Sequence, residues 1–185
     1  MTVGKLAARV LIGGLMFGHG AQKLNGSFGG PGLAGTDGMM TALNMHPPRR
    51  NSLAAGLVEA VGGPMLALGL ATPLASAAII GNMVVAIRKV HLANGPWAAN
   101  GGWEYNAVII AALTVLAEQG PGAASLDRAV GIERTGPRGG LGALALGTGA
   151  AFAAIEMGSR NAPAPSVEDN AAPFSETAGD PATSD

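Results

Sequence analysis

The sequence has no cysteine among its 185 residues. Disulfide bonds, thiolate metal sites, iron–sulfur clusters and Cys-x-x-Cys redox chemistry are therefore excluded within this chain. Charged residues are scarce as well, at 12%, which is about half the share found in ordinary globular proteins. The net charge of −1 gives no basic footprint for binding nucleic acid.

Apolar residues and glycine take the place of charge. Hydrophobic residues make up 48% of the chain, glycine accounts for 30 positions, and the mean hydropathy is +0.33. Glycine has no side chain, so it allows helices to pack closely against each other in a lipid bilayer. The composition therefore predicts an all-α membrane protein, with a length that suits one domain.

Four apolar runs are predicted to be transmembrane helices, since a span needs roughly 20 residues and the fourth run, which is short, is adequate with flanking polar residues at the interfaces. We expect them to form an up-down four-helix bundle within a domain of residues 1–131, with helices at about 3–24, 52–71, 74–92 and 103–118. The first run lacks a clear cleavage site, so we interpret it as a retained span with Arg9 snorkelling to the near surface. Within it, Gly14-Leu-Met-Phe-Gly18 predicts close helix packing.

The other segments are less regular. Glycines break the loop after the first run, where Thr36 is predicted to cap a short interfacial helix. Residues 132–158 hold a linker and a further apolar run, 139–157, which we interpret as a fifth transmembrane helix. That run is mostly glycine and alanine, so a helix lying on the membrane surface is the alternative. Residues 159–185 carry one basic and five acidic side chains among Pro and Ala, which predicts a disordered acidic tail.

Topology gathers polar residues at one membrane face. In an up-down bundle, the ends of the first and third helices meet the starts of the second and fourth. An N-terminus inside the cell is favoured, although lysines and arginines divide five against five between the two faces. The candidate site residues at this face are His19, Lys23, Glu59, Arg88, His91, Glu104 and Tyr105.

Glu59 lies deepest of these residues. A charge at the bilayer centre costs about 2.5–3.5 kcal/mol, so the carboxylate should turn inward to a partner. Arg88 is the first predicted partner and Lys23 the second. Helical spacing puts His19 with Lys23 on one face, and Arg88 with His91 on another.

Two interpretations of this cluster stand beside each other. One is a polar pocket for a quinone-like or other small polar ligand, with protons passing through the histidines and glutamates. The other is a network of ion pairs that only fixes helix register. A metal site built from two histidines and a carboxylate is conceivable, but the spacing is no signature, and no metal is predicted.

The order of several motifs resembles the DoxX family of small bacterial membrane proteins. The matching pieces span about residues 5–131 and include His19-Gly-Ala-Gln-Lys23, Glu59-Ala-Val-Gly-Gly63, Gly101-Gly-Trp-Glu-Tyr105 and Ser125-Leu-Asp127. Asn106 departs from the pattern, since a small residue such as alanine is expected there. The resemblance implies a four-helix, multi-pass protein of the bacterial inner (cell) membrane.

The resemblance also implies a redox-associated role. Our leading hypothesis is an integral membrane subunit of a redox or oxidative-stress complex that binds a quinone and depends on protein partners for electrons. It would then be a non-autonomous part of a quinone-linked oxidoreductase. The alternatives are a non-catalytic scaffold that anchors soluble stress enzymes and a small-solute carrier.

Overall fold

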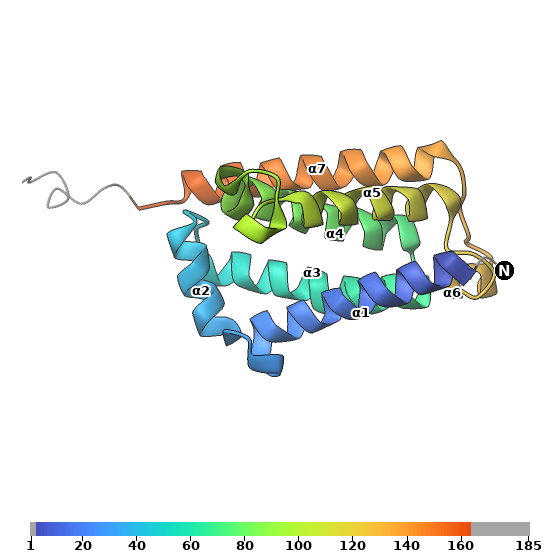
Figure 1. The fold of residues 1–185 in the computed structure, drawn as a ribbon, viewed down its shortest axis with the longest axis horizontal. Coiled ribbons are helices and arrows are strands. Elements are labelled where there is room, and N and C mark those ends of the chain that lie inside the picture. Colours follow the sequence, from blue (N-terminus) through green and yellow to red (C-terminus); the bar gives the residue numbers. More distant parts are fainter. Residues whose placement is uncertain (1–2, 164–185) are drawn as a thin grey trace, which may run out of the picture.

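Residues 3–163 are described in a computed structural model, and they fold entirely into helices and their connections (Figure 1). The α-helices are α1 (Val3–Asn25), α2 (Gly32–Ala42), α3 (Pro48–Leu68), α4 (Thr72–Ala86), α5 (Glu104–Gln119), α6 (Leu126–Ala129) and α7 (Pro137–Arg160). The predicted acidic tail begins inside α7, and its residues from 164 onward lie outside the described part of the chain.

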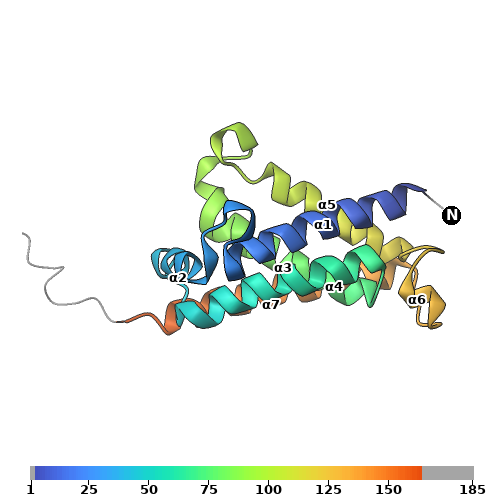
Figure 2. The ribbon, with the colours of Figure 1, turned by 90° about the horizontal axis from the view of Figure 1, so that it is seen from below.

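Five long helices, α1, α3, α4, α5 and α7, run roughly along one axis (Figures 1 and 2). Helix α2 crosses one end of this bundle, and α6 lies at the other end. The centre is filled by apolar side chains from α3, α4 and α5, of which Leu66, Ile79 and Leu113 are completely buried. The predicted antiparallel pairing of the second and third runs is present, because α3 and α4 pack together after a three-residue turn.

The turn between α3 and α4 depends on backbone geometry that glycine favours. Gly69 ends α3 in the left-handed region, with φ of 65°, and its N–H donates to the carbonyl of Leu66. Helix α3 begins four residues earlier than predicted, at Pro48, because proline is well suited to the first position of a helix. Thr36 lies inside α2 rather than capping it, and its hydroxyl donates to the carbonyls of Gly32 and Lys23.

Helices α1 and α3 pack through glycines, but not through the predicted pair. An added Cβ on Gly14 or Gly18 would meet nothing within 4 Å, so neither residue faces a neighbour. Gly13 and Gly20 are buried instead, and a Cβ there would collide with the backbone of Gly63 and Ala60. The packing face therefore follows a spacing of seven residues, and the prediction from Gly-x-x-x-Gly alone chose the wrong side of the helix.

Three helices in the described chain are long and apolar enough to cross a membrane: Pro48–Leu68, Thr72–Asn94 and Pro137–Arg160. Helix α5 has 16 residues and is short for a span, while α1 carries three cationic side chains. Large apolar side chains nevertheless lie outward on all the long helices, where Leu11, Val61, Val108 and Leu141 are each more than half exposed. Such an apolar exterior is what a bilayer requires.

Helix α7, the predicted fifth apolar helix, packs along α4 and α5. Its Gly147 lies so close to α4 that an added Cβ would be 2.9 Å from the Ile80 side chain. This approach fits the small-residue packing expected between helices in lipid.

Arg9 does not snorkel to the membrane surface as predicted, but is buried inside the protein. Its side chain is 1% exposed, and its guanidinium donates to the backbone carbonyls of Ala67, Pro121 and Ala124. The loop after α5 folds back over the start of α1 and supplies two of these acceptors. Arg9 therefore holds the ends of three helices together inside the protein.

Candidate functional site

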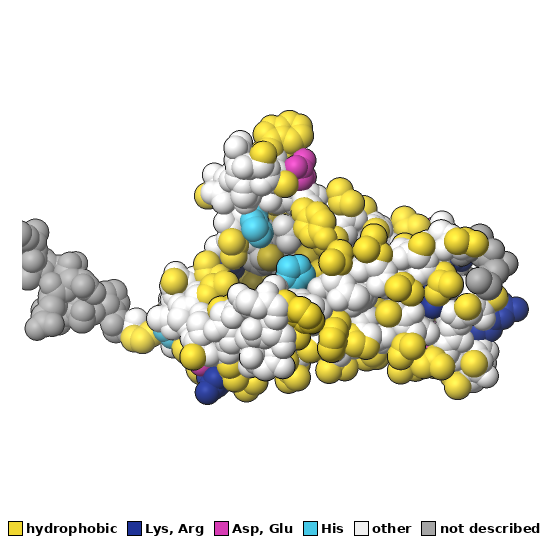
Figure 3. Space-filling model, turned by 60° about the horizontal axis from the view of Figure 1, so that its bottom comes forward, with side chains coloured by type: hydrophobic (Ala, Val, Ile, Leu, Met, Phe, Trp, Pro, Cys, Tyr) yellow, Lys and Arg dark blue, Asp and Glu magenta, His cyan; other side chains and the backbone are white. Residues whose placement is uncertain are grey.

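A hollow of about 410 Å³ lies near the α2 end of the bundle, between α1, α4, α5 and the loop before α5. Five of the seven predicted site residues line it: His19, Lys23, Glu59, His91 and Tyr105. Figure 3 shows this face of the molecule, with two cyan histidine side chains flanking a recess beneath the projecting loop. The structure thus brings together most of the cluster that the topology predicted.

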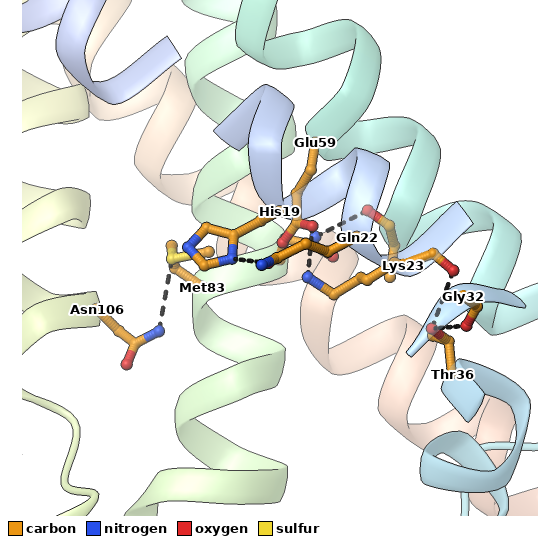
Figure 4. A network of polar contacts seen from close by, with 10 residues as sticks. His19, Gln22, Lys23, Gly32, Thr36, Glu59, Met83 and Asn106 are labelled. Atoms are coloured by element: carbon orange, nitrogen blue, oxygen red, sulfur yellow. Dashed lines mark hydrogen bonds and ion pairs between the residues drawn. The ribbon is translucent and has the colours of Figure 1, made fainter. Parts of the chain in front are cut away.

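A partly buried ion pair between Lys23 and Glu59 lines the hollow. The Lys23 ammonium lies 2.5 Å from Glu59 Oε2, and the two side chains are 22% and 4% exposed (Figure 4). The inward turn of Glu59 agrees with the prediction, but its partner is Lys23 rather than Arg88. Both charges are needed, because a carboxylate this deeply buried is costly without a cation beside it.

Arg88 lies in a π-helical turn and contacts another helix instead of Glu59. Residues Ile87–His91 form i→i+5 hydrogen bonds, so this turn contains more residues than an α-helical turn. Side chains three positions apart therefore do not share a face as they would in an α-helix. Arg88 is exposed and sits 5.8 Å from the ring centre of Phe152 on α7. His91 faces the hollow, and its Nδ1 lies 2.7 Å from the carbonyl of Gly101. The predicted shared face of these two residues is therefore wrong.

The loop before α5 covers one side of the hollow. Glu104 does not line it, because its Oε1 accepts a hydrogen bond from the N–H of Ala98 and so fixes the loop. Tyr105 is the next residue and does line the hollow, with half of its surface exposed. On the opposite wall, His19 Nδ1 lies 3.1 Å from Gln22 Oε1.

Met83 and Asn106 are among the lining residues that sequence reasoning missed. Both are buried, and the amide of Asn106 makes a weak 3.5 Å contact with the sulfur of Met83 (Figure 4). A thioether sulfur is a weak hydrogen-bond acceptor. The Asn106 amide is therefore able to exchange this contact for a stronger hydrogen bond to a ligand in the hollow. The signal was present, because Asn106 is a polar residue directly before the apolar run of α5 and departs from the expected small residue.

The chemistry available in the hollow is hydrogen bonding and proton exchange. His19, His91, Tyr105, Asn106 and the Lys23–Glu59 pair line an otherwise apolar space. Within residues 3–163, no group of three or more His, Asp or Glu side chains is placed to hold a metal ion.

An all-helical bundle with an apolar exterior, apolar helices of spanning length and a polar hollow near one end defines a multi-pass membrane protein. Within this class the chain carries a DoxX family domain, since the model of that family matches residues 4–92. The match contains α1, α2, α3 and α4, and with them His19, Lys23, Glu59 and His91. It ends before the later motifs that had suggested a resemblance as far as residue 131. Comparison with curated proteins and with solved structures gave no match.

Proposed function

We propose that this protein is a quinone-binding membrane subunit of a redox complex, and that the hollow holds the quinone head group. The observation that supports this proposal best is the lining itself. Hydrogen-bonding side chains from α1, α3, the π-turn after α4, and α5 surround a small space that is otherwise formed by apolar groups such as Met16 and Ile109.

The chemistry of a quinone fits this lining. A quinone presents two carbonyl oxygens that accept hydrogen bonds, on a flat apolar ring. Asn106 comes from α5 and can donate from its amide, while Lys23 comes from α1 and can donate from its ammonium. His91 and His19 direct Nδ1 at the Gly101 carbonyl and at Gln22 Oε1, so each can donate to a quinone from Nε2 only as an imidazolium. Donors on two sides of an apolar space would orient such a ring, because polar groups placed around an apolar pocket fix the pose of a ligand.

Reduction of a quinone to its quinol takes up two electrons and two protons. The histidines of the hollow have the side-chain type that exchanges protons near neutral pH, and Glu59 adds a carboxylate. This chain has no cysteine to bear an iron–sulfur cluster, so the electrons come from a partner protein with its own redox group. The protein is in this account a non-autonomous subunit.

The proposed setting is the bacterial inner membrane, with α1, α3, α4, α5 and α7 all crossing it. Outward apolar side chains on each of these helices support that arrangement. Trp97 on the loop beside the hollow is 64% exposed, as expected for an aromatic residue at the membrane–water boundary. A quinone dissolved in the bilayer would therefore meet the hollow close to the membrane surface.

The direct test is a titration of the purified full chain in mild detergent with decyl-ubiquinone or with menadione. Native mass spectrometry measures the fraction of protein that carries bound quinone at each concentration. His91→Phe replaces a hydrogen-bonding imidazole on the wall of the hollow with a larger apolar ring, so we expect at least about a tenfold loss of affinity for the quinone, or roughly 1.4 kcal/mol. His46→Phe is the matched control, because His46 does not line the hollow.

Two other outcomes would redirect the function. If no quinone binds while a soluble oxidoreductase stays bound to the wild-type protein, the protein is a scaffold. If no quinone binds while a small solute crosses liposomes that contain the protein, it is a carrier. Either result would contradict the proposed quinone site.

A further inference from the structure

A second recess lies at the opposite end of the bundle, where α4 and α7 both begin. This α4–α7 groove has a volume of about 710 Å³. Its walls are apolar side chains of the two helices, including Leu74, Ala143 and Leu146, and its mouth carries Arg134 and Arg138. We propose that the groove binds an anionic phospholipid, with the phosphate at the two arginines and an acyl chain between the helices.

Charge at the mouth points to an anion. Arg134 and Arg138 are both exposed, and within residues 3–163 neither has a carboxylate within 4 Å. Glu133 is the acidic residue that lines the groove, and its Oε2 is 3.2 Å from an Arg128 nitrogen. The mouth therefore presents two cations whose guanidinium groups are free to bind a phosphate in a fork geometry.

The walls point to a lipid rather than to a free phosphate. Helices α4 and α7 are both among the candidate membrane spans, and the groove follows their first turns from the arginines toward the bilayer. Leu74 and Leu146 are each more than half exposed along it. Basic recesses at the ends of transmembrane helices are suited to anionic lipid head groups, and an apolar channel below such a recess suits the chain.

The test compares two lipids that differ in head-group charge but not in their chains. The detergent-solubilised full chain is titrated with dioleoylphosphatidylglycerol or dioleoylphosphatidylcholine, and bound lipid is counted by native mass spectrometry. Each arginine near the surface contributes to attraction of an anionic lipid, so the pair should favour phosphatidylglycerol by about tenfold to thirtyfold. An Arg134→Gln/Arg138→Gln variant should lose that preference.

Three controls make the result decisive. Arg49→Gln/Arg50→Gln removes two cations from the other end of the bundle and should leave the preference intact. Gly142→Phe keeps both arginines but fills the groove, since an added Cβ at Gly142 meets nothing within 4 Å, and it should weaken lipid binding. Glycerol 3-phosphate carries the phosphate without chains and should not displace bound phosphatidylglycerol.

Opposite results would overturn the proposal. Equal binding of the two lipids would show that the arginines do not select charge. An equal loss in the Arg49→Gln/Arg50→Gln variant would show general electrostatic attraction without a site. Displacement by glycerol 3-phosphate, or unchanged lipid binding in Gly142→Phe, would leave no role for the apolar groove.

Discussion

Removing one member of the Lys23–Glu59 pair should destabilise the protein unequally, depending on which member is lost. Lys23→Met leaves a carboxylate that is 4% exposed without its cation, whereas Glu59→Gln leaves an ammonium that is 22% exposed and can still bond the amide oxygen. A buried charge stripped of its partner costs about 3–5 kcal/mol. We expect Lys23→Met to lower the free energy of unfolding by about 3 kcal/mol, at the low end of that range because the hollow admits some solvent. We expect Glu59→Gln to lower it by about 1 kcal/mol.

Thermal unfolding in detergent, followed by the fluorescence of Trp97 and Trp103, measures this difference. At roughly 2–4 °C per kcal/mol for a chain of this size, Lys23→Met should melt about 4–8 °C below Glu59→Gln. The double variant should cost less than the sum of the two single variants, because the second change removes the charge that the first left unpaired. Equal melting points for the two single variants, or a lower one for Glu59→Gln, would refute the reasoning.

Other substitutions test the packing and the end of the bundle opposite the hollow. Gly13→Ala should destabilise by about 1–3 kcal/mol because its Cβ collides with α3, while Gly14→Ala, which faces open space, should not, as thermal unfolding of the two variants will show. Asp127→Ala should cost about 2 kcal/mol, since both carboxylate oxygens accept N–H bonds at the start of α4, and faster proteolysis near the α3–α4 turn would report the loss. Arg9→Met should lower the melting temperature by more than Lys5→Met, because the buried Arg9 side chain donates to three carbonyls in buried or partly buried hydrogen bonds, whereas Lys5 donates to one carbonyl in an exposed hydrogen bond.

Apolar patterning was enough to predict the helical class and the gathering of polar residues near one end. Glu59 was expected to turn inward because a charge in hydrocarbon is costly, and it does so. The identity of its partner could not be predicted in the same way. Arg88 lies in the π-turn at Ile87–His91, which no local sequence rule predicts, and its guanidinium sits over the Phe152 ring of α7.

Arg9 and Asp127 show a second limit of sequence reasoning. A cation early in an apolar run is expected to snorkel when the helix is considered alone. Here the loop after α5 folds over it, and residues more than a hundred positions away supply its acceptors. Asp127 is likewise buried because it accepts from Ala71 and Thr72 at the start of a helix far earlier in the chain. Such contacts follow from tertiary packing, which local patterns do not contain.

The measurement closest to the central claim is photolabelling with an azido-quinone in membranes, followed by peptide mapping of the labelled chain. If the hollow is a quinone site, label should concentrate on its walls, in Met16–Lys23 and Met83–Ile109, and excess unlabelled quinone should remove it. Asn106→Leu, which takes an amide from the wall, should reduce that labelling. Label spread over lipid-facing positions such as Leu11 and Val61, with no displacement by quinone, would contradict the account.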